Sequence, residues 1–243
     1  MKLFMRIFSA EILKWRKTKI YQLILLSPII SMASAVSGEF DMSDNRWLNT
    51  YVAMIFTHGT LFLPMVTGVF AGYLCRYEHL DGGWKQMLTL PIHRSHLYFV
   101  KFTTIMLLIA IMQLLLLPGL FLAGTIKGIT DPIPYELLLR GITGGWIATF
   151  PLVALQLWVS SAWKSFAAPM AINVIFTIPS ILAVNSETYG PIYPWAQPFL
   201  AMLPFSEQGG IFFFSVQTLV LVIFGSFLLF YIGGLRMFTR RIY

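Results

Sequence analysis

Charged residues are scarce in this sequence. Asp, Glu, Lys and Arg together make up 11% of the 243 residues, whereas 57% are hydrophobic, and the mean hydropathy is +0.74. A typical water-soluble domain carries about 25% charged residues, so this composition argues against one. The sequence therefore predicts an integral membrane protein.

Several chemical signatures are also missing. The chain has a single cysteine, Cys75, which excludes an internal disulfide, and we interpret it as a small packing residue. No phosphate-binding loop of the form G-x-x-x-x-G-K-[ST] occurs, and no polar stretch is long enough for a soluble domain. The chain is therefore not expected to hydrolyse ATP itself.

Histidines offer little support for a metal site or a catalytic site. His79, His93 and His96 share one polar segment, but their spacing fits no closed zinc set and no cysteine joins them. The apolar runs contain one ionisable candidate, His58, with no acidic or histidine partner at the same depth. We expect no metal site and no catalytic residue, and we interpret His58 as a polar contact between helices.

Long apolar runs dominate the chain. Each supplies about 20 apolar residues, the length that a helix needs to cross about 30 Å of hydrocarbon. The runs lie at residues 20–36, 51–75, 102–124, 142–163, 166–184 and 211–235. They are apolar on every side, unlike the alternating strands of a membrane barrel, so the predicted fold is all-α with six transmembrane helices. A signal peptide is the alternative for the first run, but its basic lead is long and itself patterned.

The basic residues predict the orientation, because Lys and Arg accumulate in cytoplasmic loops. Of the 17 basic residues, only Arg46, Lys127 and Arg140 fall in loops of the opposite side. Both termini are therefore predicted to be cytoplasmic, which agrees with six spans. The net charge of +7 is explained by contact with an anionic leaflet, so no nucleic-acid partner is expected.

The first 18 residues predict an amphipathic helix at the inner membrane surface. Phe4, Ile7, Phe8 and Trp15 recur at the spacing of one helical face, whereas charged residues such as Glu11 lie largely elsewhere. The alternative is a basic flank that only keeps the terminus inside.

The charged segment 76–101 has a pattern of its own. Asp81, Gly82 and Gly83 predict a helix break, the stretch 84–90 predicts a short amphipathic helix lying along the membrane, and Pro91 ends it. Such a transverse helix would present a compact surface to the cytosol.

At these residues the chain resembles the permeases of type-2 ABC exporters. The resemblance rests on Glu78, the Gly82-Gly83 pair, the Leu-x-x-Pro that ends at Pro91, then Arg94 and Lys101. It implies that this segment is a coupling helix that docks on a separate ATPase subunit, and that the N-terminal helix is the family's elbow helix. The implied ATPase interface comprises Glu78, Gly82, Gly83, Trp84, Pro91, Arg94 and Lys101, with Lys164 of a short inner loop as a second contact.

Prolines and aromatic residues are concentrated in residues 185–210, the outer segment. This composition favours broken helices at the membrane surface. The resemblance implies an outer gate that dips into the membrane, with Pro194, Trp195 and Phe199 as gate residues. An aromatic belt on an ordinary loop is the alternative.

The resemblance implies a single transmembrane domain over residues 1–243, acting as the permease subunit of an exporter in the bacterial cytoplasmic membrane. The chain would hold no cofactor, MgATP would bind to the ATPase partner, and a second permease, identical or a paralogue, would complete the path. The chain looks most like permeases of self-protection systems against bacitracin or lantibiotics, which implies an amphipathic peptide or lipid-like substrate. A proton-driven carrier, an intramembrane enzyme and a non-transporting sensor subunit are the alternatives.

Overall fold

All regular structure in the described part of the chain is helical. The computed structural model describes residues 2–16, 21–38, 40–41, 43–79, 84, 93–204 and 216–240, and no strand occurs among them. The helices are α1 (Lys2–Arg16), α2 (Tyr21–Ser37), α3 (Arg46–Thr57), the π-helix η1 (His58–Phe62), α4 (Leu63–His79), α6 (Arg94–Leu114), α7 (Leu116–Ile126), α8 (Tyr135–Ala148), α9 (Phe150–Ala162), α10 (Ala167–Ala183), α11 (Gln197–Met202) and α12 (Val216–Arg240).

Four helical stretches of the described chain are long and apolar enough to cross a membrane. They are Arg46–Arg76, Arg94–Ile126, Tyr135–Ala162 and Val216–Arg240. Two shorter apolar helices, Gln22–Ser37 and Ala167–Ala183, correspond to the other two predicted spans. The all-helical membrane fold is confirmed, and the count of six spans stays a prediction.

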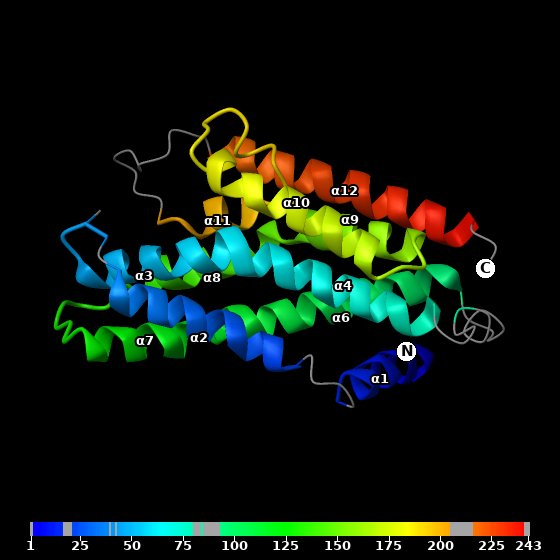
Figure 1. Cartoon of the computed structure of the whole chain (residues 1–243), viewed down its shortest axis with the longest axis horizontal. Helices are drawn as coiled ribbons and strands as arrows, with labels where there is room; N and C mark the ends of the chain where they lie inside the picture. Colours follow the sequence, from blue (N-terminus) through cyan, green and yellow to red (C-terminus); the bar gives the residue numbers. More distant parts are fainter. Residues whose placement is uncertain are drawn as a thin grey trace.

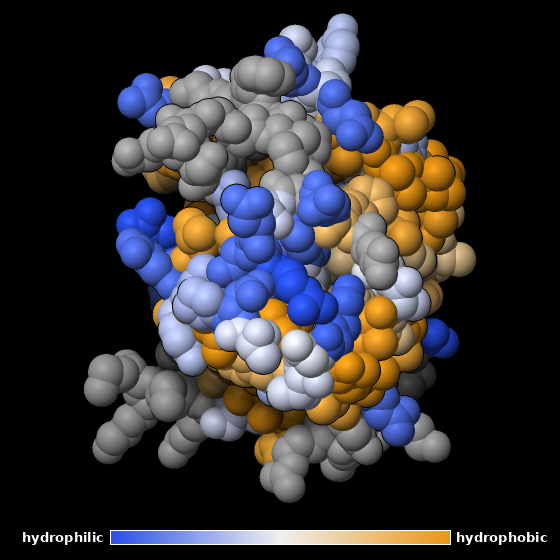
Figure 2. All heavy atoms as spheres, turned by 90° about the vertical axis from the view of Figure 1, so that its left-hand side faces the viewer, coloured by the Kyte–Doolittle hydropathy of each residue, from blue (hydrophilic) through white to orange (hydrophobic). Residues whose placement is uncertain are grey.

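The helices form one elongated bundle, and α1 lies at one end of it (Figure 1). The C-terminal end of α12 lies at the same end (Figure 1). Within the bundle α9 packs against both α4 and α12, and α2 packs against α3 and α7. At the opposite end hydrophilic side chains gather near the middle, with apolar ones along the flanks (Figure 2).

The stretch from Arg46 to His79 continues through α3, η1 and α4. Asn45 caps its start, because the Asn45 side chain accepts hydrogen bonds from the backbone N–H groups of Trp47 and Leu48. The part from Arg46 to Arg76, which is long and apolar enough to cross a membrane, has 31 residues. At 1.5 Å per residue its length is about 46 Å, which exceeds the roughly 30 Å of hydrocarbon. The end of α4 therefore has room to project beyond the hydrocarbon.

Two long stretches are interrupted next to prolines. The α6–α7 stretch breaks at Leu115, three residues before Pro118, and the α8–α9 stretch breaks at Thr149, two residues before Pro151. A proline has no N–H for the carbonyl four residues earlier, so each proline weakens the helix at this point.

The helix ends differ from those predicted around the coupling segment. Segment 76–101 was predicted as a loop from its charges, but α4 continues to His79 and α6 begins at Arg94. Charge does not end a helix when the charged side chains find partners on neighbouring helices, and Glu78 and Lys101 pair with each other. Both residues therefore lie on helices.

The short helix α11 packs against a glycine-rich face of α8. A Cβ added at Gly141 would lie 2.7 Å from the Met202 carbonyl oxygen, and one at Gly144 would lie 2.7 Å from the Ala201 carbonyl oxygen. Tyr51 Oη donates a hydrogen bond of 3.0 Å to the same Met202 carbonyl. The glycines thus permit a close approach that fixes α11 between α8 and α3.

Candidate functional site

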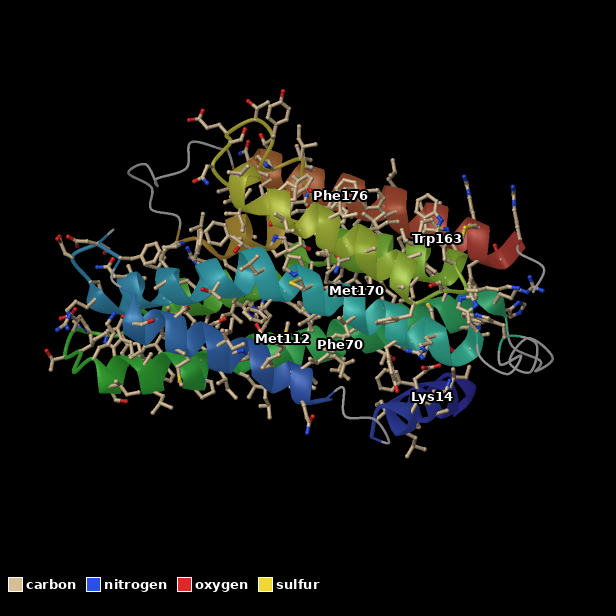
Figure 3. The ribbon with its side chains drawn as sticks, viewed as in Figure 1. Lys14, Phe70, Met112, Trp163, Met170 and Phe176 are labelled. Atoms are coloured by element: carbon tan, nitrogen blue, oxygen red, sulfur yellow. The ribbon has the colours of Figure 1, made fainter. Side chains whose placement is uncertain are left out.

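Four charged side chains from three helices meet where α1 packs against the bundle. Glu11 and Lys14 come from α1, Glu78 from α4 and Lys101 from α6; we call them the ion cluster. Lys101 Nζ lies 2.8 Å from Glu78 Oε2 and 3.2 Å from Glu11 Oε1. Lys14 Nζ lies 2.6 Å from Glu78 Oε1 and 3.2 Å from Glu11 Oε1. Figure 3 shows Lys14 on α1, at the end of the molecule where α4 ends and α6 begins.

Three members of the ion cluster are buried. Glu11, Glu78 and Lys101 are 1%, 2% and 1% exposed, whereas the Lys14 side chain is 30% exposed. Two carboxylates balance two ammonium groups, so the buried charge is neutralised in place. Removing one partner of a buried ion pair typically costs about 3–5 kcal/mol, because the remaining charge has no compensation. The cluster therefore joins α1 firmly to α4 and α6.

The electrostatics keep the Glu78 carboxylate ionised. Burial alone would raise the pKa of Glu78, but the ammonium groups of Lys101 and Lys14 outweigh burial and hold this pKa below its usual range. Lys101 also donates to the Leu74 carbonyl oxygen at 3.2 Å, so all three hydrogens of its ammonium group have acceptors.

Glu11 corrects the sequence analysis of the N-terminal helix. The charged residues of this helix were expected largely away from its apolar face, but Glu11 is buried beside Ile7, one turn earlier on the same face. Ile7 is buried and Phe8 packs against the core, whereas the side chains of Phe4 and Trp15 lie outside the described residues. One signal could have identified Glu11: it is the only acidic residue before Glu39, in a segment whose other charged residues are all basic.

Trp84 covers the ion cluster. Its side chain is buried, and Lys101 Nζ lies 5.4 Å from the ring centroid, within the range of a cation–π contact. Trp84 Nε1 donates a 3.2 Å hydrogen bond to His79 Nδ1, and the Trp84 ring meets the edge of Phe238 at 5.1 Å. Trp84 thus packs its side chain against the core instead of presenting it to a partner.

Arg94 joins the beginning of α6 to the end of α12. Arg94 Nη1 donates a hydrogen bond of 3.0 Å to the Thr239 carbonyl oxygen. The remaining predicted interface residues of this segment, Gly82, Gly83 and Pro91, lie outside the described residues.

The second predicted contact, the short loop between α9 and α10, lies against the end of α4. Lys164 is exposed in this loop. The Arg76 guanidinium lies 5.8 Å from the Phe166 ring centroid, and His79 Nε2 lies 3.4 Å from the Ser160 carbonyl oxygen. Because His79 Nδ1 accepts from Trp84, its Nε2 carries the proton and donates to Ser160. The structure therefore places the loop of Lys164 beside the end of α4.

The surface at this end is basic. Among the described residues the exposed charged side chains here are Arg76, Lys164, Arg236 and Arg240, whereas the acidic Glu11 and Glu78 are buried. Burying the acids leaves a positive surface, which suits an anionic leaflet or an acidic protein partner.

The predicted gate residues face inward at the other half of the bundle. Trp195 and Phe199 are buried, and Pro194 is half-buried. Phe199 meets the edge of Phe56 with ring centroids 5.8 Å apart. A Cβ added at Gly59 would lie 2.9 Å from the Phe199 Cα, so α11 contacts the π-helix directly.

The histidines behave as structural residues. His58 is fully buried, and its Nδ1 lies 2.7 Å from Ser27 Oγ of α2, which confirms a polar contact between helices. His93 and His96 face each other with ring centroids 5.7 Å apart. Among the described residues no group of three or more His, Cys, Asp or Glu side chains could hold a metal ion.

Comparison with known proteins identifies the family. A family model described as ABC-2 family transporter protein matches residues 7–180, which span the whole ion cluster and the loop of Lys164. A bacitracin transport permease protein, BCRB of Bacillus licheniformis, is 29% identical over 136 residues. That match covers 53% of this chain and 62% of the relative's length. The chain therefore belongs to the ABC-2 family of transporters and is an ABC transporter membrane permease, related to bacitracin permeases.

Proposed function

We propose that this chain is the permease of an ATP-driven exporter that removes an amphipathic peptide antibiotic from the membrane. The family match supports the transport role, and the bacitracin permease supports the substrate class. The alternatives of a carrier, an intramembrane enzyme or a sensor have no comparable support.

The observation that carries the coupling proposal is the ion cluster beside the two inner loops. The cluster ties α1 to α4 and α6, and the exposed basic residues Arg76 and Lys164 lie near His79, the residue after Glu78. A separate ATPase that binds MgATP would dock at this end. Its closure would push on the loops, and the buried ion pairs would pass the movement to three helices at once.

In this arrangement α1 is the elbow helix, both termini are cytoplasmic, and all six apolar helices cross the bacterial cytoplasmic membrane. Helices α2 and α10 have 17 residues each, or about 26 Å at 1.5 Å per residue, close to the hydrocarbon thickness. A second permease, identical or a paralogue, would complete the path. Residues 185–210 would re-enter the membrane as the outer gate, because Phe199 of α11 packs against the middle of a membrane-spanning stretch.

Gly82, Gly83 and Pro91 would shape the docking surface, and Lys164 would contact the ATPase directly. The buried Glu78, Trp84 and Lys101, together with Arg94, would position that surface instead of touching the partner.

The test is co-purification of the full chain with its candidate ABC ATPase, together with cellular tolerance of bacitracin. We expect Lys164→Glu to weaken ATPase capture and lower tolerance, since it reverses an exposed charge at the docking surface. Arg140→Glu, also exposed but on α8, is the matched control and should change neither. If no ATPase is captured, or if both variants behave alike, the docking assignment is wrong. Export that survives ATP depletion but collapses with the proton gradient would indicate a carrier instead.

A further inference from the structure

One buried side chain in α10 contacts three other parts of the chain. Asn173 Nδ2 lies 2.9 Å from the Pro64 carbonyl oxygen and 3.3 Å from that of Met65, both in α4. Asn173 Oδ1 accepts from Gln156 Nε2 of α9 at 2.8 Å and from Trp195 Nε1 of the outer segment at 2.8 Å. Asn173 has no exposed surface.

The carboxamide of Asn173 is saturated. Its two N–H groups have two carbonyl acceptors, and its oxygen has two N–H donors, which is the full capacity of an asparagine side chain. The partners also fix the orientation of the amide, because the reverse assignment would set oxygen against carbonyl oxygens and N–H groups against N–H groups. The group is therefore built for these partners.

The surroundings are shaped to this contact. A Cβ at Gly68 would lie 2.1 Å from Asn173 Nδ2, so only a glycine admits the side chain here. Trp195 stacks on Phe176, one turn from Asn173 along α10, with centroids 5.0 Å apart, and Tyr193 Oη donates to the Phe176 carbonyl oxygen at 2.6 Å. Figure 3 shows Phe176 on α10, toward the end opposite Trp163.

We propose that Asn173 is a positioning residue that holds the outer segment in register with α4 and α9. Water cannot replace these hydrogen bonds in an apolar interior, so separating the elements would leave several polar groups without partners. The outer segment and α4 therefore move together. The other end of α4 carries Glu78, so a movement at the ion cluster would also displace Trp195. This consequence rests on the proposed transport function.

Hydrogen–deuterium exchange of the full chain in lipid nanodiscs tests the contact without any transport assay. Asn173→Ala removes all four bonds, and Trp195→Phe removes one donor while keeping an aromatic ring to stack on Phe176. We expect each variant to raise exchange of residues 186–203 by about tenfold, because each breaks the hydrogen bond that joins Asn173 to the outer segment and about 1.4 kcal/mol corresponds to a factor of ten. Asn185→Ala is the matched control, because Asn185 is exposed and its side chain donates to the Ile181 carbonyl oxygen of the last turn of α10.

The double variant separates positioning from a general loss of packing. If Trp195 is held through Asn173, adding Trp195→Phe to Asn173→Ala should cause no further increase in exchange at residues 190–196. Additive increases, or unchanged exchange in Asn173→Ala, would overturn the proposal. Bacitracin tolerance should fall to the same level in both single variants at unchanged abundance in the membrane, and retained tolerance would also overturn it. If the parent chain gives no tolerance with its ATPase, the proposed function fails, and the exchange data still decide whether Asn173 holds the outer segment.

Discussion

At the scale of single residues, Lys101 shows that the role of a charge in an apolar setting depends on the residues that pair with it. In the sequence it marks only the inner end of a predicted span. In the fold it is 1% exposed and contacts acidic side chains from two other helices. Such a residue connects helices, because no solvent can take the place of its partners.

Replacing Lys101 with Met keeps most of the side-chain volume and removes the charge. We expect the free energy of unfolding to fall by about 3–5 kcal/mol, because Glu11 and Glu78 would then have Lys14 as their one remaining ion-pair partner in the ion cluster. Thermal unfolding in detergent measures the loss, and Lys101→Met combined with Glu11→Gln should recover part of it. Arg140→Met, at an exposed surface pair, should change stability by less than about 1 kcal/mol. Equal effects of the two Met variants would contradict the buried cluster.

At the scale of elements, most helices could be predicted because an apolar run of about 20 residues has one stable conformation in a bilayer. The helix ends around the charged segment 76–101 could not, whereas those of α2 and α10 lie within one residue of the predicted runs. Arg76, Glu78 and Lys101 belong to the segment whose charges predict a loop between two spans, yet all three lie on helices, because their partners are remote in sequence. The burial of Glu11 was missed for the same reason.

Two other features lie beyond sequence patterns. The π-helix at His58–Phe62 carries no periodicity signal, because it adds one residue to a single turn. The contacts of Asn173 could not be predicted either, because a lone asparagine in an apolar run indicates a polar contact but not the residues that form it. The outer segment, by contrast, is distinguished by its composition alone, because aromatic residues and prolines are concentrated there.

The packing of α11 on α8 gives a prediction about elements. Gly141→Val should destabilise the fold by about 1–3 kcal/mol, the usual cost of overpacking, because a Cβ at Gly141 would lie 2.7 Å from the Met202 carbonyl oxygen. Gly225→Ala in α12 is the control, since a Cβ there meets nothing within 4 Å. That change should leave stability unchanged or raise it by about 0.5–1 kcal/mol. If Gly141→Val unfolds at the parent temperature, α11 is not held by α8 as described.

At the scale of the whole molecule, the two ends of the bundle differ in charge, as the proposed docking of an ATPase at one end would require. One end carries α1, the ion cluster and an exposed basic surface. The other end mixes both signs of charge, with Arg46 beside Asp131 and Arg140 beside Glu136. This asymmetry agrees with the predicted orientation, because Lys and Arg accumulate in cytoplasmic loops.

The most direct measurement of the central claim is a site-specific cross-link between the permease and its ATPase in membrane vesicles. Lys164→Cys and Tyr189→Cys are two exposed positions, one before α10 and one after it. Each is introduced with Cys75→Ala, which removes the native thiol. We expect the Lys164→Cys chain to cross-link to the ATPase, with a yield that changes when MgATP is added, and the Tyr189→Cys chain to give no product. A cross-link through Tyr189→Cys, or none through Lys164→Cys while the two subunits co-purify, would contradict the claim that the ion-cluster end is the docking end.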